Sequence, residues 1–225
     1  MRITSFILFI FPFSLFSQTN EGKIWTEVGV NGDIVKDLDW AAELTTRFGV
    51  NGLETIFPSV SIKYKVKKWF KPSIEYRYIL DRKNFDTYSN SHRLNFNADF
   101  KHTIERLSIK SRIRYQYSFN RLVNSELYNP EFDQAIRLKL VGSYDINGSF
   151  LSPSISGEIF YNPVYGLYGQ QFTKLRLFAG VDVEMDGPHE ISVGYIFDNR
   201  INLSRPLTKH ILSLGYSYKI GSSKK

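Results

Sequence analysis

The sequence predicts an all-β protein, a closed antiparallel transmembrane β-barrel of about 10–12 strands with short periplasmic turns and longer outer loops. Three observations predict this fold class. The chain opens with a short apolar leader, the remainder alternates between apolar and polar residues with a period of two, and the turns alternate between short and long. A period of two is typical of strands that present one face to apolar and the other to polar surroundings.

The leader, residues 1–17 (MRITSFILFIFPFSLFS), has the features of a cleaved secretory signal. Arg2 supplies a positive start, 6–16 is an apolar run of about 11 residues, and Ser17 is a small residue at a plausible cleavage point. A membrane-spanning helix needs about 20 apolar residues, so this segment is too short for an anchor. We therefore expect a signal peptide at 1–17 and an outer-membrane β-barrel at 18–225.

The first strand is expected at 24–34, and the second, at 38–48, has the clearest alternation. Leu38 and Trp40 share an apolar face of the second strand, and Glu43 lies on its polar face. The same alternation recurs further along the chain, in the segments 59–66, 93–101, 107–117, 174–184 and 212–220. Each of these segments can therefore form a strand with one apolar and one polar face.

Strand length and charge indicate a membrane barrel rather than a soluble one. The segments run for about 10–13 residues, whereas strands of soluble proteins average about 5–6 and transmembrane strands need about 9–11. Lys110, Arg112 and Arg114 form an unbroken charged row on one polar face. The inward face of a soluble barrel would be apolar, so such rows predict a polar lumen and an apolar wall turned to lipid.

The connections are expected to alternate in length, with short turns at 66–70, 101–106, 144–149 and 185–189 and long loops at 80–90, 119–133, 162–171 and 198–207. Pro72 and Pro153 open strands, where a missing backbone donor is tolerated. About eleven candidate strands result, although bacterial single-chain barrels have even numbers. The last strand should run from a long outer loop to the periplasm. If strand directions alternate back from there, the first strand, at 24–34, runs in the wrong direction. We therefore expect 10 or 12 strands, with 24–34 incomplete or one break overlooked.

The amino-acid composition excludes several other kinds of protein and site. The 225 residues include no cysteine, which excludes a disulfide framework and a thiolate metal site. Aromatic residues make up 16%, a content that suits the aromatic girdles of a barrel. The formal net charge is +7, but no basic run or recognition helix points to nucleic acid. The charge is explained by a solvated surface or by a basic lumen.

Several short motifs resemble an uncharacterised outer-membrane family known mainly from Bacteroidota, domain of unknown function 2490. They are Trp25 just after the leader, ELTTRF at 43–48, the strand end Tyr76-Arg77-Tyr78, and Arg112-Ile113-Arg114-Tyr115. The resemblance spans most of the chain after the leader. It implies a barrel, and it carries no activity, cofactor or catalytic residue.

The search for catalytic chemistry finds no strong motif. His92 and His210 lie near outer strand ends, and a pair such as His210 with Asp198 would be needed for a rim hydrolase of lipid or peptide. A solvated rim histidine explains either one better. Asp182 and Glu184 have the spacing of a carboxylate pair for a metal, but lumen arginines can neutralise them. We expect no catalytic residues, no metal and no cofactor, with an outer-membrane enzyme as the alternative.

The polar faces together predict a charge ladder that lines the lumen. Its basic members are Arg47, Lys63, Arg77, Arg93, Lys110, Arg112, Arg114, Arg137, Lys139 and Arg176, and its acidic members are Glu43, Glu75, Asp99, Glu158, Asp182 and Glu184. Facing arginines and carboxylates can pair across strands. The ladder therefore either cross-links and plugs the barrel or lines a narrow pore that passes small anionic solutes.

Aromatic residues are expected at both membrane interfaces. Trp40, Trp69, Phe70 and Phe100 lie near short turns, and Phe48, Tyr78, Tyr117 and Tyr161 lie near long loops. The loop 161–171 (YNPVYGLYGQQ) is either a ligand-contacting surface or a loop lying on the girdle. The expected location is the outer membrane of a Gram-negative bacterium, with membrane lipid and the barrel-assembly machinery as partners.

Overall fold

A computed structural model describes residues 19–84, 87–119, 128–165, 167–185, 187–203 and 206–221. The predicted signal peptide at 1–17 lies outside these residues. The described chain forms eleven strands: β1 (Thr19–Val35), β2 (Leu38–Gly49), β3 (Gly52–Tyr64), β4 (Phe70–Asn84), β5 (Thr87–Ile104), β6 (Leu107–Phe119), β7 (Ala135–Tyr144), β8 (Leu151–Asn162), β9 (Gln171–Glu184), β10 (His189–Arg200) and β11 (Leu207–Ile220). Within the part of the chain described, no helix is long or apolar enough to cross a membrane.

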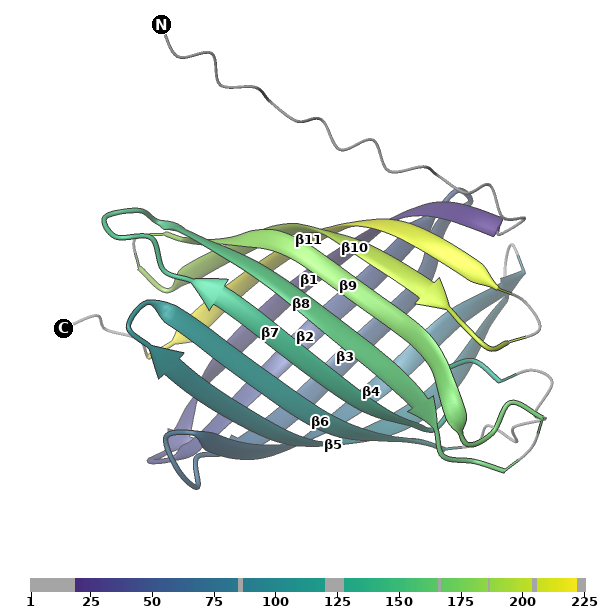
Figure 1. Cartoon of the computed structure of the whole chain (residues 1–225), viewed down its shortest axis with the longest axis horizontal. Helices are drawn as coiled ribbons and strands as arrows, with labels where there is room; N and C mark the ends of the chain where they lie inside the picture. Colours follow the sequence, from purple (N-terminus) through teal and green to yellow (C-terminus); the bar gives the residue numbers. More distant parts are fainter. Residues whose placement is uncertain are drawn as a thin grey trace, which may run out of the picture.

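The strands close into one barrel in which each pairs with its neighbours in sequence, and β1 completes the ring against β11 (Figure 1). Sequential pairs are antiparallel, but β1 and β11 are parallel, from Thr19 opposite Leu207 to Gly32 opposite Ile220. The expectation of 10 or 12 strands is therefore wrong for the described chain, and 24–34 is part of a complete strand. A parallel ladder is only slightly less stable per residue than an antiparallel one, so a single parallel seam lets an odd number of strands close.

The two ends of the barrel differ in their connections. At the short-turn end, left in Figure 1, lie the β1–β2, β3–β4, β5–β6, β7–β8 and β9–β10 turns and the end of β11. At the opposite, long-loop end lie the start of β1 and the strand ends between which the sequence is longest, from β6 to β7 and from β8 to β9.

The prediction of a long loop at 80–90 is wrong for the residues that the structure describes. Asp81 pairs with Ser89 and Arg82 with Tyr88, so β4 and β5 continue as a hairpin with a register shift near its tip. The polar sequence there reads as a loop, but the paired backbones satisfy each other's hydrogen bonds and keep it extended.

The two faces of the sheet have opposite chemistry. Large apolar side chains such as Val60 and Ile62 are 55% and 53% exposed on the outside, whereas Asn95, Gln116 and Lys174 are fully buried on the inside. The alternation predicted from sequence therefore places apolar groups outward and polar groups inward. The interior also holds an apolar cluster of Trp25, Ile196 and Ile211, with Phe178 packed against it.

A pair of glycines makes room for Phe178. Gly180 of β9 lies opposite Gly194 of β10, and both positions adjoin the Phe178 ring. A Cβ added at Gly194 would lie 2.6 Å from Phe178 Cζ and 3.0 Å from the Ala179 carbonyl oxygen. Glycine is therefore required here by close approach within the sheet.

Candidate functional site

The barrel interior contains a short segment that is not a strand. Residues 128–134, called the inner turn here, fold back between the walls, where Glu131 is 6% exposed and Asp133 is 2% exposed. The Asn129 carbonyl accepts hydrogen bonds from the amides of Phe132 and Asp133 at 3.0 and 2.9 Å. The Asn129 side chain accepts the Glu131 amide at 3.1 Å, as in an Asx turn. The sequence Asn-Pro-Glu-Phe-Asp thus forms a compact turn that holds itself together.

Side chains of the barrel wall hold the inner turn by its backbone. Arg93 of β5 donates to the Glu131 carbonyl at 2.5 Å, and Gln116 of β6 donates to the Asp133 carbonyl. Ser118 donates to the Phe132 carbonyl. The Phe132 ring packs with Phe57 and Ile79 in a second interior apolar cluster. Hydrogen bonds and apolar contacts therefore fix the turn on the β3–β6 side of the barrel.

The Glu131 carboxylate connects the turn to the opposite side. It lies 2.5 Å from Arg47 Nη1 of β2, 2.5 Å from Lys174 Nζ and 2.6 Å from Arg176 Nη2 of β9. Burial alone would raise the pKa of Glu131, but the neighbouring charges of Arg47 and Lys174 outweigh it and hold that pKa well below its usual value. Glu131 is thus an ionised carboxylate that joins β2 and β9 through the inner turn.

Asp198 and Glu158 extend this network on the β8–β10 wall. Lys174 and Arg176 both reach Asp198, at 2.7 and 2.6 Å. Glu158 accepts from Arg137 at 2.8 Å. Lys174, Arg176 and Arg137 therefore each have a carboxylate partner, which is the condition for a stable buried charge.

Glu75 forms a separate cluster on the β4–β6 wall. It lies 2.6 Å from Arg77 Nη2 and 3.0 Å from Arg114 Nη2, and Asn95 donates to it at 3.0 Å. Arg114 also donates to Asn97 at 2.6 Å. The cluster cross-links three neighbouring strands through one carboxylate.

The barrel interior contains a cavity of about 350 Å³, and Glu131 of the inner turn is one of the residues that line it. Nine basic and four acidic side chains line it, so positive charge dominates. Two aromatic rings support the guanidinium groups: Arg47 lies 3.8 Å from the Trp25 ring centroid and Arg137 lies 4.4 Å from that of Phe160. Such stacking orients the guanidinium groups, whose edges bind the carboxylates of Glu131 and Glu158 respectively.

Toward the short-turn end the interior charges separate by sign. A recess of about 300 Å³ is lined by Lys63, Lys71, Lys110, Arg112 and Lys139, with Asp99 paired to Arg112 at 2.5 Å. A smaller recess of about 140 Å³ is lined by the acidic residues Glu27, Glu43, Asp182 and Glu190. The basic recess adjoins the cavity, because Lys63, Arg112 and Lys139 line both.

Most of the residues expected in the charge ladder fall into three groups, and Arg93 and Glu184 lie outside them. The paired clusters contain Arg47, Arg77, Arg114, Arg137, Arg176, Glu75 and Glu158, and Arg93 holds the inner turn. The basic recess is lined by Lys63, Lys110, Arg112, Lys139 and Asp99, and the acidic recess is lined by Glu43 and Asp182. Glu184 is exposed at the end of β9. Whether this interior conducts or binds solutes stays a prediction.

Sequence reasoning missed Glu131 and the interior rings of Trp25, Phe57 and Phe160. Glu131 lies in a loop segment, where no periodicity reports the direction of a side chain. The Asn129-Pro130 turn signal and the adjoining Phe132 were the only indications of a structured segment. The three rings lie on the polar face of their strands, so their position in the alternation could have placed them inside.

Aromatic side chains lie at both ends of the outer wall. At the short-turn end, the Trp69 and Phe100 rings stack at 6.2 Å and the Phe70 and Phe100 rings at 5.1 Å, with Trp40 nearby on β2. Phe48, Tyr117 and Tyr161 lie toward the long-loop end, near the ends of their strands. The strand end expected at Tyr78 is wrong, because β4 continues past it to Asn84. Their contact with membrane interfaces stays a prediction.

Three of the four histidines occupy a recurring arrangement on the outer wall. Directly opposite His92, His189 and His210 lie Tyr78, Tyr218 and Phe197. A hydrogen bond joins Nδ1 of each histidine to the hydroxyl of Tyr76, Tyr216 and Tyr195 respectively, at 2.5–2.8 Å. The suggested pair of His210 with Asp198 is wrong, because Asp198 points inward to Lys174 while His210 packs on outward rings. Among the residues described, no group of His, Asp or Glu is arranged to hold a metal ion.

Comparison with known proteins gives one match. A family model described as "Protein of unknown function (DUF2490)" matches residues 22–221, which covers the whole barrel apart from the first residues of β1. No curated protein matches the chain. No solved structure matches it either.

Proposed function

Because the chain belongs to the DUF2490 family, whose function is unknown, we propose a role from the geometry of the barrel. The protein is a non-catalytic outer-membrane barrel with a narrow, anion-preferring interior that the inner turn holds shut. The observation that carries this proposal is the Glu131 carboxylate, which joins Arg47 of β2 to Lys174 and Arg176 of β9 across the interior.

Membrane insertion is supported by the reversed burial of the two faces. Polar groups fill the inside, and large apolar groups cover the outside along strands of 10 to 18 residues. Transmembrane strands need about 9–11 residues. In the proposed orientation, the short-turn end faces the periplasm and the long-loop end faces outward. The partners are then membrane lipid and, during biogenesis, the barrel-assembly machinery.

The preference for anions is supported by the lining of the cavity. Nine basic residues against four acidic ones give a positive field in a space of about 350 Å³. The Arg47 guanidinium, stacked on Trp25 and paired with Glu131, would become free for a small carboxylate or phosphate when Glu131 moves away. The inner turn lies above this cavity, so its release would open a basic path through the barrel.

Single-channel recording in a planar bilayer tests the proposal, using protein purified from the membranes of a bacterial host. We expect the wild type to remain mostly closed and Glu131→Gln to open frequently, with reversal potentials that show anion preference. Glu105→Gln, in the exposed β5–β6 turn, is the matched control and should behave as the wild type. A wild type that conducts steadily, or a Glu131→Gln channel that prefers cations, would contradict the proposal, as would a protein recovered without any membrane association.

A further inference from the structure

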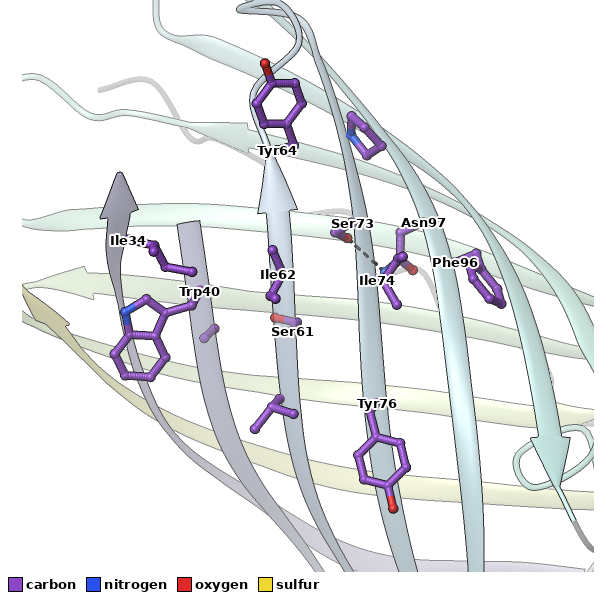
Figure 2. Close-up of a pocket in the computed structure, with 13 residues that line it drawn as sticks. Ile34, Trp40, Ser61, Ile62, Tyr64, Ser73, Ile74, Tyr76, Phe96 and Asn97 are labelled. Atoms are coloured by element: carbon purple, nitrogen blue, oxygen red, sulfur yellow. Dashed lines mark hydrogen bonds between the residues drawn. The ribbon is translucent and has the colours of Figure 1, made fainter. Parts of the chain in front are cut away.

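The outer wall has an apolar groove of about 720 Å³ across β1–β5, near the short-turn end (Figure 2). Its floor is aliphatic, with Val60, Ile62 and Ile74 each more than half exposed. Trp40 bounds it on one side and Phe96 on the other. The volume is within the range of pockets that take small ligands, about 300–1,000 Å³.

Strand register explains the hollow shape. Trp40 lies opposite Ile62, Ile62 opposite Ile74, and Ile74 opposite Phe96, so two large rings flank two branched aliphatic side chains in one row. In the next row toward the turn, Pro72 lies opposite Ala98, and both are small. The groove is therefore built into the pattern of side-chain sizes on consecutive strands.

A basic turn joins the lining residues Tyr64 and Pro72 at the short-turn end of the groove. Tyr64, which lines the groove, points its hydroxyl toward the β3–β4 hairpin in Figure 2. That hairpin carries the exposed residues Lys67, Lys68 and Trp69, and no acidic residue occurs in 64–72. No ion pair joins Lys67 or Lys68 to any other residue that the structure describes.

The neighbouring charges leave these two lysines available. The β1–β2 turn is joined to the hairpin by a backbone hydrogen bond from Lys65 to Asp37 at 2.8 Å. The acidic side chains that flank this turn, Asp33 of β1 and Asp39 of β2, are engaged with the Lys65 ammonium, at 3.6 and 2.7 Å. Asp37, in the turn itself, forms no ion pair with Lys67 or Lys68 among the described residues. Lys36 in the same turn is exposed and adds to the positive surface.

We propose that the groove and the β3–β4 turn together bind an anionic phospholipid. One acyl chain lies along Val60, Ile62 and Ile74, and the phosphate accepts charge-assisted hydrogen bonds from Lys67 and Lys68. The combination of an apolar groove with unpaired cations at one end matches a molecule that has an apolar chain and an anionic head. This inference rests on the proposed insertion of the outer wall into a membrane.

Native mass spectrometry of the detergent-solubilised protein measures the binding, with phosphatidylglycerol and phosphatidylcholine of identical acyl chains as probes. We expect the wild type to retain phosphatidylglycerol in preference to phosphatidylcholine. Lys67→Gln/Lys68→Gln should weaken retention of phosphatidylglycerol by roughly fivefold for each charge removed and leave phosphatidylcholine unchanged. Ile74→Trp, which fills the groove, should reduce retention of both lipids.

The control Arg106→Gln/Lys219→Gln removes two exposed charges at the same end of the barrel, away from the groove, and should match the wild type. Equal phosphatidylglycerol retention by the wild type and by Lys67→Gln/Lys68→Gln would overturn the inference, as would full retention by Ile74→Trp. A lipid-free dimer that Ile74→Trp dissociates would also overturn it, in favour of a second copy of the chain. Liposome insertion is assayed in parallel, because a protein that inserts but retains no lipid refutes only the lipid site, whereas failure to insert refutes the proposed function.

Discussion

The Glu131 carboxylate and the Lys174 ammonium meet at 2.5 Å inside the barrel, although 43 positions separate them in the chain. Lys174 is completely buried, and its second partner is Asp198 at 2.7 Å. The inner turn thus supplies a charge that the β9 wall needs. Removing Glu131 would leave Lys174 and Arg176 to share Asp198 and would leave Arg47 buried without this carboxylate, which is the costly situation for interior charges.

Replacing Glu131 with Gln should destabilise the barrel by about 3 kcal/mol, because Arg47, Lys174 and Arg176 lose their shared carboxylate. Urea unfolding in detergent, followed by tryptophan fluorescence, measures the change. Glu105→Gln serves as the control, since Glu105 is exposed. A stability equal to that of the wild type would mean that the inner turn is not held by its charge.

The stability difference between the wild type and Glu131→Gln should depend on pH. The folded-state pKa of Glu131 is depressed, so its contribution is fully present above the unfolded value of about 4.3 and is lost as pH falls through the folded-state pKa. The two proteins should therefore differ most near neutral pH, and the difference should shrink progressively as the pH falls below about 4. Unfolding at a series of pH values tests this, and a difference that grows in acid would contradict it.

Gly194→Ala should destabilise the barrel by about 1–3 kcal/mol, because the added Cβ meets the Phe178 ring and the Ala179 carbonyl. Thermal unfolding measures the loss. Gly142→Ala is the control, since a Cβ there meets only Ile155, at an ordinary 3.9 Å. Combining Gly194→Ala with Phe178→Ala should recover part of the loss, and no recovery would indicate that backbone contacts dominate.

The parallel seam predicts a specific cross-link. Ile24 of β1 lies opposite Leu212 of β11, and both point outward. The chain has no cysteine, so Ile24→Cys/Leu212→Cys should form one disulfide on mild oxidation, because neighbouring strands lie about 4.8 Å apart. Ile24→Cys/Tyr216→Cys, four residues along β11, should not. Cross-linking of the second pair instead of the first would refute the register, and gel mobility before and after reduction distinguishes the two.

Much of this architecture could be predicted from sequence because strands have a strict period. The alternation of Leu38 and Trp40 against Glu43 gave the direction of each side chain, and it placed Arg114, Glu75 and Glu158 on inward positions that the structure also has. The pairing between these residues follows from strand register, which depends on the turns and is harder to derive.

The features that could not be predicted from the sequence also have physical explanations. Alternation carries no information on strand direction, so the parallel pairing of β1 with β11 could not be predicted and the count was forced to an even number. Asp81 and Arg82 resemble a loop by composition, although tertiary pairing keeps them in β4. Glu131 depends on contacts with strands that are distant in sequence, and a loop offers no periodicity from which to infer them.

The seam between β1 and β11 also bears on how the protein reaches its native state. It joins the first strand of the sheet to the last, so its contacts have the largest sequence separation in the molecule and form only after the intervening hairpins are in place. Until then the sheet has two free edges, each with a row of unpaired amides and carbonyls that can pair with other chains. The step at which maturation competes with aggregation is therefore the meeting of β1 with β11, and any factor that assists biogenesis acts most effectively by shielding these two edges.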